Sequence, residues 1–126
     1  MKRFGGIVNI LYKSMTIQQA IAVLDGYIEN PHEGLPDDIF YFVSRNAPLI
    51  NVDLLVKDER GRTLLSWRDD EYAGRGWHVV GGIVRYKEDW LTRIRKVADM
   101  EIGTPIQINP VPIGVFEEIS KTNINR

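Results

Sequence analysis

The sequence lacks cysteine, an excess of charge of either sign, and any long hydrophobic run. The absence of cysteine excludes a disulfide framework, a thiolate metal site and a cysteine nucleophile. Sixteen Lys and Arg stand against 17 Asp and Glu, for a net charge of −1, which disfavours a nucleic-acid coat or a polybasic membrane-surface protein. No hydrophobic run approaches the roughly 20 residues of a membrane span. We therefore expect a soluble cytoplasmic protein with no nucleic-acid or membrane partner.

The length and composition indicate one globular domain with a small extension. The chain has 126 residues, of which 44% are hydrophobic and 26% charged, close to the globular average. Residues 1–14 read as an extended or disordered arm, and Met15 is an alternative start. We expect an N-terminal arm and helix over residues 1–34 and an α/β domain over residues 35–126.

Three segments carry helical patterns. Apolar residues recur with a period of 3.6 between Thr16, a candidate N-cap, and Asn30-Pro31, which predicts a helix over Thr16–Asn30. A short helix is expected from Pro36, with two aspartates in its first turn. Glu88–Ile102 is the second strong helical pattern, and Gly103 is its expected C-terminal stop.

Four segments read as strands. Leu49–Lys57 and Thr63–Arg68 flank a Gly-containing turn and predict a hairpin, while Trp77–Val80 and Val111–Ile119 are further strands. Asp53 lies within the first of these apolar segments. We expect it to be buried, and therefore to need a polar partner.

The segment with the clearest chemistry is Gly81–Thr104. Two glycines after a strand let backbone carbonyls approach a ligand or an ion closely. The helix that follows carries acidic residues near both ends. A loop carbonyl and a helix carboxylate are the oxygen ligands that Mg²⁺ takes, together with substrate phosphates and water.

The spacing of these residues resembles the Nudix box. Gly82 and Glu88 match its first Gly and Glu, Lys96 stands at its Arg, and Glu101 and Gly103 match its last Glu and Gly. The resemblance implies a Nudix-like α/β/α sandwich with a mixed sheet, preceded here by an N-terminal helical extension.

Two positions depart from the box. Val97 and Met100 stand where the family has glutamates, so of three carboxylates expected on one helix face only Glu101 remains. GDP-mannose mannosyl hydrolases are a Nudix branch that loses the same two positions. The sequence is similar to that branch over about residues 35–118, including Asp37–Phe40, Pro48–Asp53, Leu64–Arg68 and Trp77–Gly82.

This resemblance implies a set of site residues. The Gly81 carbonyl and Glu101 would hold Mg²⁺, with Mn²⁺ as the alternative ion. Asp53, Arg68 and Trp77 would contact the substrate, and Arg68 would stabilise the diphosphate leaving group. Lys96 and Arg85 would also be catalytic, Lys96 at the position of the box Arg and Arg85 in place of the Arg that follows the two glycines in the family. The branch's general-base His and a Gln metal ligand would fall beyond residue 126, so we expect either a longer chain or a second protomer that completes the sheet.

We therefore expect a Mg²⁺-dependent hydrolase that releases sugar and nucleoside diphosphate from a nucleotide-sugar such as GDP-mannose. The alternatives are a conventional Nudix pyrophosphohydrolase that cleaves the diphosphate, and a catalytically weak nucleotide-binding module. The apolar stripe of the first helix, and the dimerisation of the resembled branch through its N-terminal segment, predict a homodimer formed by this segment.

Overall fold

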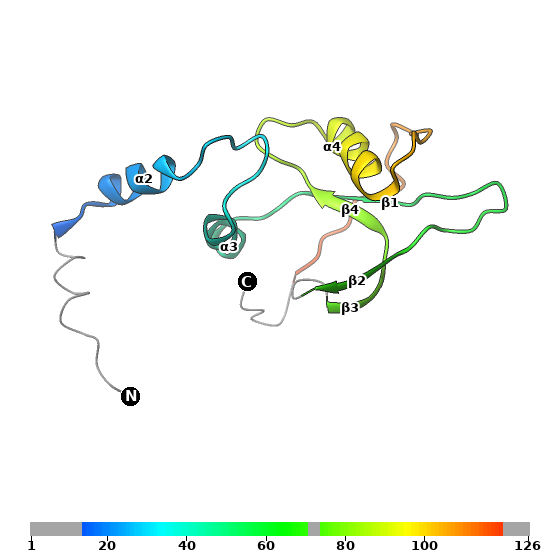
Figure 1. The fold of residues 1–126 in the computed structure, drawn as a ribbon, viewed down its shortest axis with the longest axis horizontal. Helices are drawn as coiled ribbons and strands as arrows, with labels where there is room; N and C mark the ends of the chain where they lie inside the picture. The colour runs from blue at the N-terminus through cyan, green and yellow to red at the C-terminus, as the bar shows by residue number, and fades with distance from the viewer. Residues whose placement is uncertain (1–13, 71–73, 120–126) are drawn as a thin grey trace.

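The computed structural model describes residues 14–70 and 74–119, and their fold belongs to the mixed α/β class predicted from the sequence. Two helices come first, followed by four short strands and a last helix whose end is a π-helix (Figure 1). In chain order the elements are α2 (Ile17–Gly26), α3 (Asp37–Asn46), β1 (Asn51–Leu54), β2 (Ser66–Asp70), β3 (Gly74–His78), β4 (Val80–Ile83), α4 (Trp90–Val97) and the π-helix η1 (Ala98–Ile102).

The four strands form two antiparallel pairs. β1 pairs with β4, with Val52 opposite Gly82 and Asp53 opposite Gly81. β2 pairs with β3, with Trp67 opposite Trp77. The predicted hairpin of Leu49–Lys57 with Thr63–Arg68 is wrong beyond its first pairs, because β2 pairs with the strand that closely follows it and β1 pairs with β4. Only the Lys57–Thr63 bridge and the hydrogen bond from the Leu64 N–H to the Val56 carbonyl, 2.9 Å long, join the two segments.

The core lies between the β1–β4 pair and α4. Strand β1 alternates between buried and exposed residues, and its buried side chains share a core cluster with residues of β4, α4 and η1. The cluster contains Val52, Leu54, Val80, Val97 and Ala98. Helix α4 therefore covers one face of this two-stranded sheet, as Figure 1 shows.

Gly81 and Gly82 allow this close packing. A Cβ at Gly82 would lie 3.0 Å from Cγ2 of Val97 on α4, so a larger residue would push the helix away. A Cβ at Gly81 would lie 2.5 Å from Oδ1 of Asp53 and 2.7 Å from the Val52 carbonyl oxygen on the paired strand. The glycine pair thus has a packing role on each side of β4.

The helix ends follow their capping residues. Thr16 is the N-cap of α2 as predicted, and its hydroxyl accepts from the Gln19 N–H while the Gln19 side chain accepts from the Thr16 N–H. The helix ends at Gly26 rather than Asn30. Asp89, not Glu88, is the N-cap of α4, and Gly103 ends η1 in the left-handed conformation with φ of 70°.

The predicted strand over Val111–Ile119 is wrong, because no residue of this segment lies in a strand. Pro110 and Pro112 remove backbone donors that a strand needs, and Gly114 adds a further flexible position. The large hydrophobic side chains of the segment are exposed, and Phe116 is 91% exposed. Most of the expected arm over residues 1–14 lies outside the described residues.

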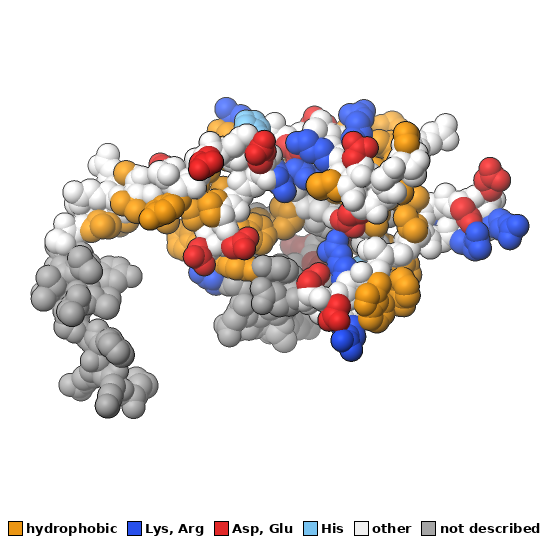
Figure 2. Space-filling view, in the orientation of Figure 1, with side chains coloured by type: hydrophobic (Ala, Val, Ile, Leu, Met, Phe, Trp, Pro, Cys, Tyr) orange, Lys and Arg blue, Asp and Glu red, His pale blue; other side chains and the backbone are white. Residues whose placement is uncertain are grey.

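Helix α2 contributes no buried residue to the core. It lies at one end of the molecule, apart from both strand pairs (Figure 1), and hydrophobic side chains line one side of it (Figure 2). Ile17, Ile21 and Leu24, all from the predicted apolar stripe, are exposed. None of the helices in residues 14–70 and 74–119 has the length and apolar character needed to cross a membrane.

The packing at Gly82 gives a testable prediction. Gly82→Ala should lower the free energy of unfolding by about 1–3 kcal/mol, because the added methyl group overpacks the contact with Val97. Gly26→Ala is the matched control, because nothing lies within 4 Å of a Cβ at that position. Urea unfolding of the parent and both variants measures the difference, and equal stability of the Gly82 variant and the parent would contradict the close packing.

Candidate functional site

Glu88, the first glutamate of the predicted box, is buried in a cluster of positive groups. Its Oε2 atom lies 2.6 Å from Nη2 of Arg93 and accepts a hydrogen bond of 3.1 Å from the Arg85 N–H. Its Oε1 atom lies 2.9 Å from Nζ of Lys96. Burial disfavours the charged form of Glu88, but hydrogen bonds from Lys96, from the Arg85 N–H and from Arg93 outweigh it and lower the pKa to about 2.

In this cluster Glu88 and Lys96 have a structural role. The side chains of Glu88 and Arg93 are only 5% and 3% exposed, so each needs the other to compensate its buried charge. Lys96, predicted to be catalytic, is half exposed and donates to Glu88. Glu88 is enclosed by these basic groups, and its Oε1 atom, which lies beside Lys96, has no hydrogen-bond partner among the described residues.

Sequence reasoning missed Arg93, the other half of this pair. The residue stands four positions before Val97, on the side of α4 that faces the sheet, and its Cδ lies 3.5 Å from a Cβ at Gly82. The sequence did contain a sign of this pair, because Arg93 is a basic residue on the apolar side of the helix, five positions after the acidic Glu88.

Arg68 and Glu101 come together although 33 positions separate them. One guanidinium nitrogen of Arg68, Nη2, lies 3.2 Å and 3.4 Å from the two carboxylate oxygens of Glu101. These distances exceed the 2.7–2.9 Å that is usual for a charge-assisted hydrogen bond, and the contacts of Glu88 are shorter. The Glu101 side chain is also 26% exposed. Among the residues that the structure describes, Glu101 is therefore loosely held by Arg68 alone and partly open to solvent.

Residues 97, 100 and 101 do not share one helix face, contrary to the expectation from the sequence. The sequence places residues 97, 100 and 101 on one face, but Val97 is 1% exposed and belongs to the core, whereas Met100 is 68% exposed. The π-helix η1 begins at Ala98, and the Gly103 N–H bonds to the Ala98 carbonyl five residues earlier. Its wider turn separates these side chains. A glutamate at position 97 would be buried in the core and not presented to a metal ion.

Asp53 is exposed, and the prediction that it is buried is wrong. Strand β1 turns Val52 and Leu54 toward the core, so the alternating Asp53 faces away from α4. Its Oδ1 accepts a hydrogen bond of 2.7 Å from the Asn51 side chain. Asp53 and Gly81, predicted for substrate and metal respectively, are neighbours across the β1–β4 pair.

Trp77 and Arg85 lie apart from the Arg68–Glu101 pair. Trp77 packs edge to face on Trp67 with ring centroids 5.2 Å apart, and both rings are exposed. Because Trp67 precedes Arg68 on β2, this aromatic pair is on the opposite face of the β2–β3 ribbon from Arg68. The Arg85 guanidinium lies against Gly34, with Cζ 3.3 Å from a Cβ at that position.

A polar pair on the Arg68 face was also missed. Ser66 and His78 are opposite each other in the β2–β3 register. The Ser66 Oγ and His78 Nε2 atoms are buried and have no hydrogen-bond partner within the part of the chain that the structure describes. Ser66 and Arg68 are two residues apart on one strand, and this spacing indicates that their side chains share a face.

The described residues offer few oxygen ligands for Mg²⁺, but enough for a site that substrate phosphates and water would complete. Within residues 14–70 and 74–119, no group of three or more His, Asp or Glu side chains is arranged to hold a metal ion. Mg²⁺ needs as few as one or two carboxylates when substrate phosphates and water complete its shell. The loosely held, solvent-accessible carboxylate of Glu101 meets this requirement, whereas the enclosed Glu88 does not.

Comparison with known proteins finds a relative that covers much of this chain. The chain is 35% identical over 95 residues to the low-salt glycan biosynthesis protein Agl8 of the archaeon Haloferax volcanii. The match covers 75% of this chain and 60% of the length of that protein. No protein-family model and no solved structure matches the chain. The Nudix resemblance therefore stays a prediction.

The Glu88 cluster predicts how stability depends on pH. The folded-state pKa of about 2 lies below the ordinary value of 4.5, so this carboxylate adds stability above pH 4.5, and that contribution disappears as the pH falls toward 2. Glu88→Gln should lower the free energy of unfolding at pH 7 by about 3–5 kcal/mol, because Arg93 is left buried without its counter-charge.

Urea unfolding at neutral pH and at pH near 3.5 tests this expectation. The variant should lose less stability on acidification than the parent. Glu59→Gln, in an exposed turn, is the matched control and should follow the parent. An identical loss of stability with pH in the Glu88 variant and the parent would contradict the role of this pair.

Proposed function

We propose that the chain is a Mg²⁺-dependent hydrolase of a nucleoside diphosphate-sugar, GDP-mannose or a similar compound, that releases the sugar and the nucleoside diphosphate. The observation that carries this proposal is the loose Arg68–Glu101 pair, which brings a carboxylate and a guanidinium together at a partly exposed place. The name of the Haloferax volcanii relative refers to glycan biosynthesis. Because glycans are built from activated sugars, this name supports a nucleotide-sugar as the substrate class.

Charge neutralisation is the task proposed for the chain's own residues. Arg68 would release Glu101 and bind the diphosphate through its planar fork of donors, as guanidinium groups bind phosphate elsewhere. Lys96 is half exposed and adds a positive charge on α4. Glu101 and the Gly81 carbonyl would hold Mg²⁺, with Mn²⁺ as the alternative, which supplies further positive charge to the leaving group when bound.

The proposed bond changes follow from this arrangement of charge. A water oxygen forms a bond to the anomeric carbon, and the bond from that carbon to the β-phosphate oxygen breaks. The electron pair leaves with the nucleoside diphosphate, whose charge Arg68 stabilises. The water gives up one proton to a base that is not among the residues assigned here. Asp53 stays in the proposal as a substrate contact, and Trp77 would contact a part of the substrate that reaches the face of the β2–β3 ribbon opposite Arg68.

A nucleotide-binding module without turnover is the second candidate. The observation that favours it is the core position of Val97, together with the aliphatic Met100, because neither position offers a carboxylate to a metal ion. A binding module needs Arg68 and Lys96 but no activated water. Product analysis separates the two candidates.

The proposed partner is a second copy of this chain. The exposed apolar residues Ile17, Ile21 and Leu24 on α2 support it, since hydrophobic patches of this kind usually mark an interface. A homodimer through this N-terminal segment would bury them. Cytoplasmic location also remains part of the proposal.

Hydrolysis of GDP-mannose in oxygen-18 water tests the function. With Mg²⁺ present, the label should appear in mannose, and GDP should carry none. Glu101→Gln should lower turnover by about tenfold or more, a loss of roughly 1.4 kcal/mol of transition-state stabilisation. The matched control, Glu59→Gln, should leave turnover unchanged.

Two other results would contradict the hydrolase proposal. Label in mannose phosphate or GMP, which indicates attack at phosphorus, would favour a conventional pyrophosphohydrolase. Binding of GDP-mannose with no product would favour the binding module.

A further inference from the structure

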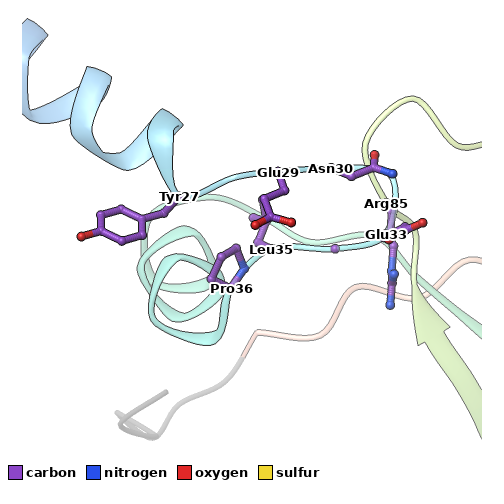
Figure 3. A pocket seen from close by; sticks show the side chains of 8 residues that line it. Tyr27, Glu29, Asn30, Glu33, Leu35, Pro36 and Arg85 are labelled. Atoms are coloured by element: carbon purple, nitrogen blue, oxygen red, sulfur yellow. The ribbon is translucent and has the colours of Figure 1, made fainter.

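A cleft lies between the segment that joins α2 to α3 and the loop that joins β4 to α4 (Figure 3). Its cavity volume is about 430 Å³, within the range of small-molecule sites. The polar side chains that line it are those of Tyr27, Glu29, Asn30, Glu33 and Arg85. Arg85 and Glu88 both lie in the β4–α4 loop, so the buried Glu88 cluster fixes one wall of the cleft.

The cleft is separate from the Arg68–Glu101 pair. Arg85 precedes α4, whereas Glu101 lies near the end of η1. The helix and the π-helix between them span roughly 18 Å at the usual rise per residue. The residues that line the cleft include neither Arg68 nor Glu101.

The charged side chains of the cleft form no ion pairs with one another. The carboxylates of Glu29 and Glu33 and the guanidinium of Arg85 form no hydrogen bond or ion pair with any residue of the described ranges 14–70 and 74–119. Gly34, with φ of 125°, leaves room for the guanidinium to lie flat against the backbone. The cleft therefore offers a fixed donor fork and two acceptors to a bound molecule.

The balance of charge disfavours an anionic ligand. Two carboxylates face one guanidinium in the cleft, so the net charge is negative. A phosphate would meet repulsion from both Glu29 and Glu33. This environment is unfavourable for the expected role of Arg85 in neutralising a diphosphate.

A pyranose ring fits this set of groups. Its edges carry neighbouring hydroxyls, which donate pairs of hydrogen bonds to a carboxylate and accept pairs from a guanidinium. One of its faces carries C–H groups, which pack against an aromatic ring. Tyr27 lines the cleft at the end away from Arg85 and is 68% exposed (Figure 3), so its ring is accessible to a ligand that reaches that end.

We propose that the cleft bounded by Tyr27, Glu29, Glu33 and Arg85 binds a neutral pyranose sugar. This binding site goes beyond the proposed hydrolase function and needs neither a metal ion nor turnover. A single sugar ring has few atoms to contribute, and the expected dissociation constant is about 1 mM.

Nitrogen-15 NMR spectra of the full chain without metal test this site. Methyl α-D-mannopyranoside and methyl α-D-glucopyranoside are the probes, each added up to about 50 mM, well above the expected dissociation constant. At least one should shift the backbone amide resonances of residues 27–30, 32–35 and 85 with saturation, and inorganic phosphate should not. Because nothing is hydrolysed, failure of the proposed enzyme activity leaves this result unaffected.

Two variants and their matched controls complete the test. Glu33→Gln and Arg85→Gln should each weaken glycoside binding by about fivefold or more, because each removes hydrogen bonds to a charged group. Glu59→Gln and Arg95→Gln change exposed residues outside the cleft and should bind as the parent does. The proposal is overturned if neither glycoside shifts these resonances, if phosphate alone shifts them, or if both cleft variants bind as tightly as the parent.

Discussion

The ion pair of Glu88 and Arg93 is the interaction on which the rest of the structure depends. It joins the β4–α4 loop to the first turns of α4, with both charges withdrawn from solvent. Such a pair adds little net stability, because desolvation of both charges offsets their attraction, but breaking it leaves a buried charge without a partner. Its effect is therefore to fix the position of α4. The same cluster holds the backbone of Arg85, whose N–H donates to Glu88.

The packing of α4 explains both the glycine pair on β4 and the valine at position 97. Gly82 lets the helix approach the sheet, and Val97 packs directly against it. A Cβ added at Gly82 would lie 3.0 Å from Val97 Cγ2. A buried valine at this position stabilises the core, whereas a carboxylate there would be buried without a partner. A valine at position 97 is thus consistent with a helix that is fixed by packing. The π-helix then turns Glu101 toward Arg68.

The sequence allowed the helices to be predicted better than the strand pairing or the site. Local signals determine helices, and the Thr16 N-cap and the Gly103 stop both lie where the pattern indicated. Strand pairing depends on contacts distant in sequence, so β1 could pair with β4 without any local sign of it. The contact of Arg68 with Glu101 spans 33 positions and was not visible as a pair. The spacing of Glu88 was recognised, but its buried partner Arg93 was not.

A Mg²⁺ titration tests the central claim, that the loose Arg68–Glu101 pair opens to accept a cation, most directly. The Arg68 guanidinium resonance is followed by nitrogen-15 NMR as Mg²⁺ is added to about 20 mM, above the millimolar range of weak cation sites. We predict a saturable shift of the Arg68 resonance in the parent, no such shift in Glu101→Gln, and no change at Arg93, whose partner is enclosed. An Arg68 resonance that does not respond, or that responds equally in the Glu101 variant, would contradict the account.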